Sequence, residues 1–156
     1  AASRRAAKQL SEPLRELFPN GLPRRLLITG SGGSGKTTCT KQVAVEACSA
    51  GFQRLAHFAP FRFPLQELAP RLAQESGLNP LYEFLNDAYG SLQVHVKALE
   101  IADSRGDPLL LLLDGLDEAH EHRHQVVTWL ETITAPHIYV IITSRPAAVD
   151  GLALGN

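Results

Sequence analysis

Short apolar runs alternate along this chain with segments in which apolar residues recur every three or four positions. Runs of the first kind, when bounded by turn residues, are typical of strands buried in a parallel sheet, and the second spacing is typical of helices. Strands are expected on this basis at 24–29, 54–59, 109–113 and 137–143. Because strands and helices alternate, the sequence predicts an α/β fold with a parallel sheet and right-handed crossovers.

The limits of these strands follow from the residues around them. The run at 109–113 is five consecutive leucines, which periodicity alone does not distinguish from a helix. Its short length and the acidic residues after it favour a fully buried strand. The strand at 54–59 is expected to stop at Pro60, because proline has no N–H to donate to a neighbouring strand. The strand at 137–143 is rich in β-branched residues and is expected to end before Pro146.

Helices are expected between the strands and before the first one. Apolar spacing and end signals place them at 11–18, from the residues after 37 up to Gly51, and at 65–75, 81–88, 91–104 and 121–134. Cys39 and Cys48 both fall on the helix that stops at Gly51, about 13 Å apart along its axis. That separation is too large for a disulfide. Free thiols are typical of a reducing compartment, so a cytoplasmic location is expected.

Composition narrows the range of partners. The 156 residues are 44% hydrophobic and 20% charged, as in soluble globular domains. With a net charge of −1, the chain has no strong field to attract nucleic acid or an anionic membrane. No apolar run approaches the ~20 residues that a membrane span needs. We therefore expect neither direct nucleic-acid binding nor membrane insertion.

The clearest chemical motif follows the first predicted strand. Residues 30–37 match the template of glycine, four residues, glycine, lysine and then serine or threonine. The glycines allow consecutive backbone N–H groups to form a concave nest for phosphate, and the following helix N-terminus adds partial positive charge. A flexible Gly/Ser linker is the alternative, but it does not require Lys36 and Thr37 after the last glycine. The residues expected to bind nucleotide are Gly30, Ser31, Gly32, Gly33, Ser34, Gly35, Lys36, Thr37 and Thr38.

Acidic residues follow the leucine run. Asp114 comes directly after it, and Asp117 and Glu118 come about one turn later. Thr37 and Asp114 are the expected Mg²⁺ ligands, because Mg²⁺ prefers one or two protein oxygens together with phosphate and water. Glu118 is the expected general base, and Asp117 its partner toward metal or water. The alternative is a solvated acidic loop that caps the next helix.

Arg145 follows the last predicted strand. A guanidinium there could bind the oxygens of a γ-phosphate in a fork, and an exposed surface arginine is the alternative. Thr143 and Ser144 beside it are lesser candidates. Because parallel strands present their carboxyl ends at one edge of a sheet, the phosphate loop, the acidic turn and Arg145 are expected to converge.

In these three motifs the chain resembles the NACHT domains, P-loop NTPases of the STAND signalling class. The similar part covers about 22–146 and rests on the 30–37 loop, on Asp-Gly-Leu-Asp-Glu at 114–118 and on Thr-Ser-Arg-Pro at 143–146. The resemblance implies a three-layer P-loop fold and ATP or GTP bound with Mg²⁺. It further implies slow hydrolysis and a nucleotide-governed switch between closed and oligomerising states. It also makes Arg62 a candidate for a supporting role, with a surface arginine equally compatible.

The resemblance also sets the expected organisation of the chain. Residues 1–21 are expected to be a linker with the short helix, and 22–156 the NTPase core. The chain contains no methionine, so we expect a piece of a longer protein or a processed product. The family's usual module continues into a further strand, a small helical domain and a winged-helix region, so this core is expected to stop after its fourth core strand. Other domains of the same longer chain and further copies of it are the expected partners.

Two other functions stay open. One is a nucleotide-binding scaffold that assembles with other domains without useful catalysis. The other, which we rank lower, is a small-molecule phosphotransferase, because 61–90 contains Arg62 and Arg71 but no dense arginine cluster. His120 and His124 share the spacing of a zinc pair, but no third ligand is evident and structural zinc needs four.

Overall fold

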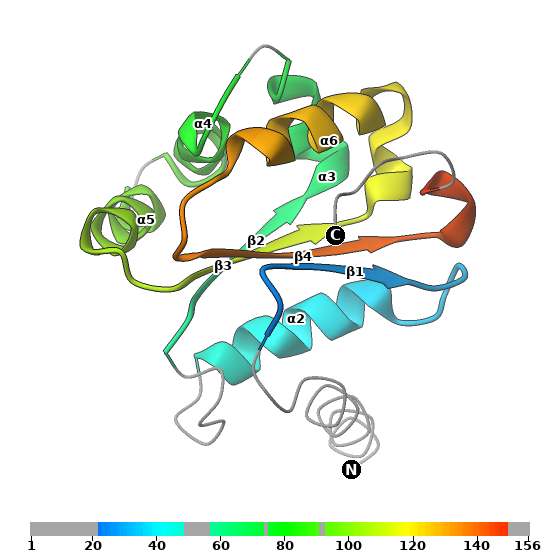
Figure 1. Cartoon of the computed structure of the whole chain (residues 1–156), viewed down its shortest axis with the longest axis horizontal. Coiled ribbons are helices and arrows are strands. Elements are labelled where there is room, and N and C mark those ends of the chain that lie inside the picture. Colours follow the sequence, from blue (N-terminus) through cyan, green and yellow to red (C-terminus); the bar gives the residue numbers. More distant parts are fainter. Residues whose placement is uncertain (1–21, 49–56, 74, 91–92, 150–156) are drawn as a thin grey trace.

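Four parallel strands form one sheet with helices on both of its faces (Figure 1). The computed structural model describes residues 22–48, 57–73, 75–90 and 93–149. The strands are β1 (Arg25–Thr29), β2 (Ala59–Pro64), β3 (Leu109–Asp114) and β4 (Ile138–Ser144), in the order β1-β4-β3-β2. The predicted α/β fold with a parallel sheet is confirmed.

Helices make up the other two layers. On one face of the sheet lies α2 (Lys36–Ala47). On the other face lie α3 (Leu65–Leu68), α4 (Asn79–Tyr89), α5 (Val94–Arg105) and α6 (Arg123–Thr132) (Figure 1). Short 3-10 helices are η1 (Ala69–Arg71), η2 (Leu116–His122) and η3 (Pro146–Ala148). None of the helices within the described ranges is long and apolar enough to cross a membrane.

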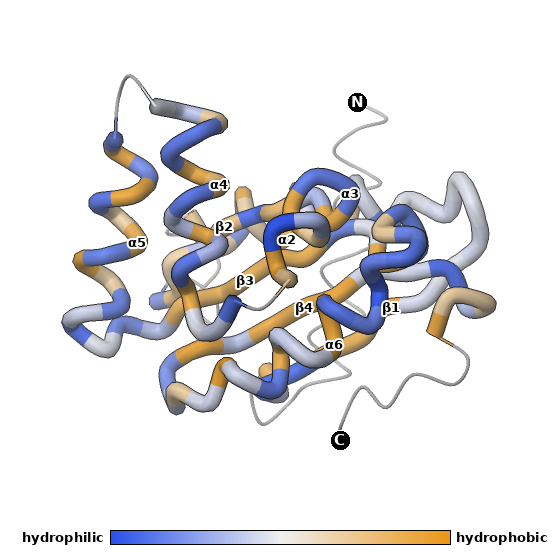
Figure 2. The backbone as a smooth tube through the Cα atoms, turned by 90° about the horizontal axis from the view of Figure 1, so that it is seen from above, coloured by the Kyte–Doolittle hydropathy of each residue, from blue (hydrophilic) through white to orange (hydrophobic). Residues whose placement is uncertain are grey.

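The leucine run forms the centre of the core. All five leucines are fully buried, and β3 has a neighbouring strand on each side. Successive side chains of a strand point to opposite faces, so Leu110 and Leu112 pack with α2 while the other three leucines pack with the helices of the opposite layer. In Figure 2, β3 and β4 are mostly hydrophobic, whereas hydrophobic and hydrophilic residues alternate along α4 and α5.

Three of the four predicted strands are confirmed to within a residue or two, and the second is wrong. The prediction placed it at 54–59 and ended it at Pro60. Instead, β2 runs from Ala59 to Pro64 and contains both Pro60 and Pro64. The physical reason is the position of β2 at the edge of the sheet, where it pairs with β3 alone. A missing N–H is tolerated on an edge strand. Residues 54–56 lie outside the described residues.

The helices differ mainly at their ends. The predicted helix at 65–75 is shorter, because α3 gives way to η1, which has Pro70 in its first turn. The predicted helix at 121–134 begins as α6 at Arg123, after a backbone break at His120 (φ 47°, ψ −120°). α4 and α5 lie within a few residues of the predictions. The predicted helix at 11–18 and the stop at Gly51 lie outside the described residues.

Candidate functional site

Residues 30–37, here called the phosphate cradle, span the loop between β1 and α2 and the first residues of α2, where the sequence predicts a nest of backbone N–H groups. Gly35 precedes α2 in the left-handed conformation (φ 86°), which a residue without a Cβ adopts at little cost. No side chain caps this helix end, and the first N–H groups of a helix have no intrahelical partner. The N-terminus of α2 is therefore free to bind an anion, with the helix dipole in the favourable direction.

Lys36 is held over the same loop. Its Nζ donates hydrogen bonds to the carbonyl oxygens of Gly30 (2.7 Å) and Ser31 (2.9 Å). The N–H of Gly30 in turn donates to the carbonyl oxygen of Ser144 at the end of β4 (3.1 Å). The phosphate cradle is thus fixed to the carboxyl end of the neighbouring strand β4. The ammonium group of Lys36 lies close to where phosphates would lie.

Asp114 ends β3 and is 6% exposed. Its Oδ1 accepts a hydrogen bond from the Thr143 hydroxyl (2.7 Å), and its Oδ2 forms an ion pair with the guanidinium of Arg62. Burial by itself raises the pKa of this carboxyl group, but hydrogen bonds from Thr143, Arg62 and Thr37 outweigh it and the pKa is lowered. Asp114 is therefore ionised at neutral pH and lies beside the Thr37 hydroxyl.

Glu118 folds back against the turn that follows Asp114. Gly115 has a φ of 84°, and a Cβ added there would lie 3.1 Å from the carboxyl carbon of Glu118. The N–H of Glu118 donates to the carbonyl oxygen of Gly115 (2.9 Å), and the N–H of Gly115 donates to Thr143 Oγ1 (3.0 Å). A side chain at residue 115 would therefore crowd the Glu118 carboxylate.

Arg145 connects the acidic turn to the cradle. Its Nε contacts Asp117 Oδ2 (2.9 Å), and its backbone N–H donates to Asp117 Oδ1 (3.1 Å). The side chain is 60% exposed, and a Cβ added to Gly32 would lie 3.7 Å from the guanidinium carbon. Arg145 thus lies over the phosphate loop, with Asp117 holding its inner edge.

One cavity of about 290 Å³ brings these groups together. Most of the predicted site residues line it, and Gly30 and Ser31 instead accept the bonds from Lys36. Its lining residues are Gly32, Gly33, Ser34, Gly35, Lys36, Thr37, Thr38, Asp114, Gly115, Asp117, Glu118, Thr143 and Arg145. The three strand ends that the sequence predicts to meet do meet here.

The donors in this cavity fit a magnesium nucleotide. Thr37 and Asp114 offer one hydroxyl and one carboxylate, the small protein share that Mg²⁺ takes when phosphate and water complete its shell. Within the described parts of the chain, no group of three or more His, Cys, Asp or Glu side chains is placed to hold a metal ion unaided. A cation here would therefore depend on phosphate oxygens for its remaining ligands.

Two residues matter more than the sequence indicated. Thr143, a lesser candidate, is fully buried and bonds both Asp114 and Gly115. Arg62, which the resemblance singled out without a definite role, contacts the carboxylate of Asp114 itself. The signal available for Thr143 was its place at a strand end, directly before Ser-Arg. The contact of Arg62 with Asp114 depends instead on the register of two strands.

Comparison with known proteins gives the following. A family model described as "NACHT domain" matches residues 24–155. The solved structure of C. elegans PCH-2 is similar over 96% of this chain and 39% of that chain, with 17% sequence identity and a TM-score of 0.48. The present chain thus spans about two fifths of that protein. A search of curated proteins gave no match.

Proposed function

The chain belongs to the NACHT family of P-loop NTPases, and we propose that its cavity binds ATP or GTP with Mg²⁺, hydrolyses it slowly and thereby acts as a regulatory switch. The observation that carries this proposal is the convergence of three strand ends on one cavity. β1 leads into the phosphate loop, β3 into Asp114 and Glu118, and β4 into Thr143 and Arg145. A solvated acidic loop or a flexible linker would not bring these groups to one place.

Each residue has a definite task in this proposal. The N-terminal turn of α2 and Lys36 bind the phosphates. Thr37 and Asp114 hold the cation, which when bound neutralises charge on the phosphate oxygens. Glu118 orients or deprotonates the attacking water, and its position against Gly115 keeps its carboxylate at the cavity wall. Asp117 holds Arg145, whose guanidinium is free on its outer edge to bind γ-phosphate oxygens.

Nucleotide binding is tested with Lys36→Ala. We expect the parent chain to bind a fluorescent ATP or GTP analogue in the presence of Mg²⁺. The variant should lose that binding, because the positive charge of the Lys36 ammonium group no longer faces the phosphates. Lys41→Ala is a matched control, since Lys41 lies on the same helix outside the cavity lining. Equal binding by the parent and by Lys36→Ala would contradict the cradle assignment.

A nucleotide-binding scaffold without useful catalysis is the second candidate. It is favoured by one observation, namely that Arg145 is already paired with Asp117. Phosphate release by Glu118→Gln and by the parent separates the two functions. A faster parent supports hydrolysis, and equal background release from both supports the scaffold. The described part of 61–90 offers no basic lid for a phosphotransferase, because Arg62 pairs with Asp114 and Arg71 pairs with Asp87.

The wider setting is proposed on the same basis. In this proposal residues 22–156 are the NTPase core, and 1–21 are an N-terminal linker. The partners are ATP or GTP, other domains of a longer chain and further copies of that chain. A cytoplasmic setting would keep the free thiols of Cys39 and Cys48 reduced.

A further inference from the structure

One oxygen of Asp114 already has a cation beside it. Arg62 pairs with Oδ2, while Oδ1 accepts the hydrogen bond from Thr143. Both oxygens of the carboxylate that is proposed to serve the Mg²⁺ site are therefore engaged by groups of the protein itself. The hydroxyl bond leaves the charge of Asp114 uncompensated, whereas the guanidinium neutralises it.

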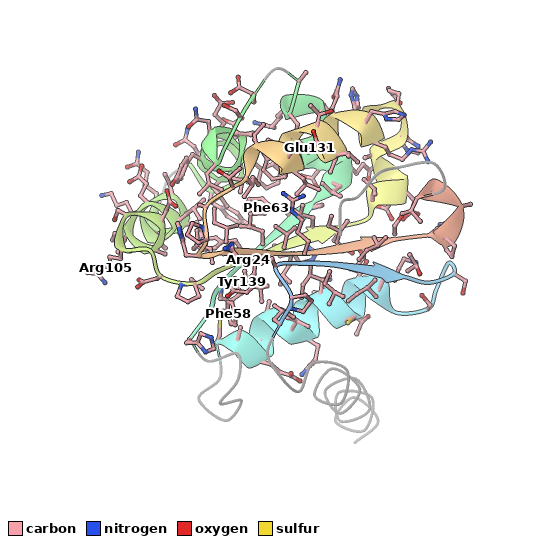
Figure 3. The ribbon with its side chains drawn as sticks, in the orientation of Figure 1. Arg24, Phe58, Phe63, Arg105, Glu131 and Tyr139 are labelled. Carbon is pink, nitrogen blue, oxygen red and sulfur yellow. The ribbon has the colours of Figure 1, made fainter. Side chains whose placement is uncertain are left out.

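The sheet register explains how Arg62 reaches Asp114. Arg62 pairs with Leu112 on β3, and both residues face the α2 side of the sheet, where Arg62 Nε lies 3.4 Å from Thr40 Oγ1. The next residue, Phe63, points into the opposite layer (Figure 3). A long side chain two positions before the end of β2 can extend to the carboxyl edge of the sheet, where Asp114 lies.

Burial makes this charge pair consequential. The Asp114 side chain is 7% exposed and that of Arg62 is 27% exposed. A carboxylate at that depth without a counter-charge would carry a large desolvation cost. Arg62 thus stabilises the ionised Asp114 as long as no other cation is present. A divalent cation between Thr37 and Asp114 would bring a second positive charge to the same carboxylate.

We propose that Arg62 is a resident counter-ion that competes with Mg²⁺ for Oδ2 of Asp114, so that loading of the magnesium nucleotide requires the guanidinium to leave this oxygen. Arg62 thereby sets the Mg²⁺ concentration at which nucleotide binds. Because Arg62 also contacts Thr40 on α2, the exchange reaches both β2 and the helix that begins at the phosphate loop. This inference rests on the proposed nucleotide function and goes beyond it in assigning the regulation of the cation site.

The test is a Mg²⁺ titration of nucleotide binding by the 156-residue chain. A fluorescent ATP analogue, with a GTP analogue in parallel, is titrated at increasing Mg²⁺ for the parent, Arg62→Gln and Arg71→Gln. Glutamine keeps a polar side chain and removes the competing charge. We expect half-maximal binding of Arg62→Gln at about threefold to tenfold less Mg²⁺ than the parent. A half-maximal concentration that is unchanged or higher would overturn the proposal, since Arg62 would then merely orient Asp114 or assist the metal.

Arg71→Gln is the matched control. Arg71 forms an ion pair of the same kind with Asp87, but that pair lies outside the cavity lining. Its Mg²⁺ requirement should equal that of the parent, and an equal decrease in both variants would overturn the proposal. Thermal unfolding without nucleotide adds a second readout. Arg62→Gln should unfold at a lower temperature than Arg71→Gln, because only the former leaves a buried carboxylate without its counter-charge.

Arg62→Lys keeps the proposal testable if Arg62→Gln does not fold. Lysine retains the charge but loses the fork geometry and is more strongly hydrated, so it should compete less well and lower the Mg²⁺ requirement by a smaller factor. An unchanged or higher requirement would again overturn the proposal. If the parent binds neither analogue even in excess Mg²⁺, the proposed function itself fails. If the parent binds but the Arg62 variants match it, only the competition is refuted.

Discussion

The hydroxyl of Thr143 donates a 2.7 Å hydrogen bond to Oδ1 of Asp114 and accepts one of 3.0 Å from the N–H of Gly115. This one buried side chain joins the end of β4 to the turn after β3. Thr143 itself is fully buried. The position of the proposed metal-binding carboxylate therefore depends on a residue of the neighbouring strand.

Replacing Thr143 tests this connection. Thr143→Val keeps the shape but leaves a carboxylate oxygen and an N–H unpaired, so we expect a loss of about 1.5–3 kcal/mol in the free energy of unfolding. Thr143→Ser keeps the hydroxyl and should lose less. Denaturant unfolding of both variants measures the difference. Equal losses would show that the methyl group, and not the hydroxyl, is what matters at this position.

Gly115 gives a second prediction, about the position of Glu118. Gly115→Ala forces a positive φ on a residue with a Cβ and brings that Cβ to 3.1 Å from the Glu118 carboxyl carbon. Gly106→Ala is the matched control, because Gly106 has a φ of 66° with nothing within 4 Å of an added Cβ. Both variants should lose about 1–2 kcal/mol of stability from the backbone alone.

Only Gly115→Ala should change the chemistry. With Glu118 displaced as general base, phosphate release should fall, by up to about 10²-fold, while Gly106→Ala should release phosphate like the parent. Release is measured with folded protein at saturating nucleotide. Parent-like release by Gly115→Ala would mean that the Glu118 carboxylate moves aside without losing its function, and would remove the steric argument for a glycine at 115.

The sequence predicted those parts of the fold whose signals are local. The phosphate loop, the five leucines and β4 each carry their pattern within a few consecutive residues, and all three were predicted at the right place. The position of β2 could not be read in this way. Pro60 and Pro64 indicate a break in isolation, and only the edge position of the strand makes them acceptable.

The site shows the same division. Most of the predicted residues line one cavity. This could be predicted because parallel strands present their carboxyl ends at one edge of the sheet whatever the strand order or register. The pairing of Arg62 with Asp114 joins residues 52 positions apart and depends on strand order and register. The break at His120, with φ 47° and ψ −120°, has no signal in its own neighbourhood. Tertiary structure decides both.

Tyr82 provides a prediction about alkaline pH. Burial, together with the nearby charges of Asp103 and Glu100 and a hydrogen bond with Asp103, raises the pKa of Tyr82 from 10.0 to about 12. A raised pKa in the folded state means that the unfolded chain loses this proton first. The contribution of Tyr82 to stability is therefore complete below pH 10 and is lost as the pH rises through about 12.

Tyr82→Phe has no phenol to deprotonate, so its free energy of unfolding should fall less steeply than that of the parent between pH 10 and 12. Denaturant unfolding at closely spaced pH values measures the two slopes. Tyr89→Phe is the control, because Tyr89 is 50% exposed on the same helix. Parallel curves for the parent and Tyr82→Phe would show that neither burial nor the carboxylates of α5 raise the pKa of Tyr82 in solution.

Cys39 within α2 and Cys48 at the end of this helix should differ in the reactivity of their thiols. Cys39 is 7% exposed, and burial, then the charges of Glu46 and Asp114, raise the pKa of its thiol. Cys48 is exposed. Because the thiolate is the reactive form, a water-soluble thiol reagent near neutral pH should modify Cys48 in the folded protein and reach Cys39 only after denaturation. Cys48→Ser should therefore abolish the native reaction, and Cys39→Ser should preserve it.

Rapid labelling of Cys48→Ser would mean that the first turns of α2 open in solution, and the phosphate cradle that depends on them would then not be preformed.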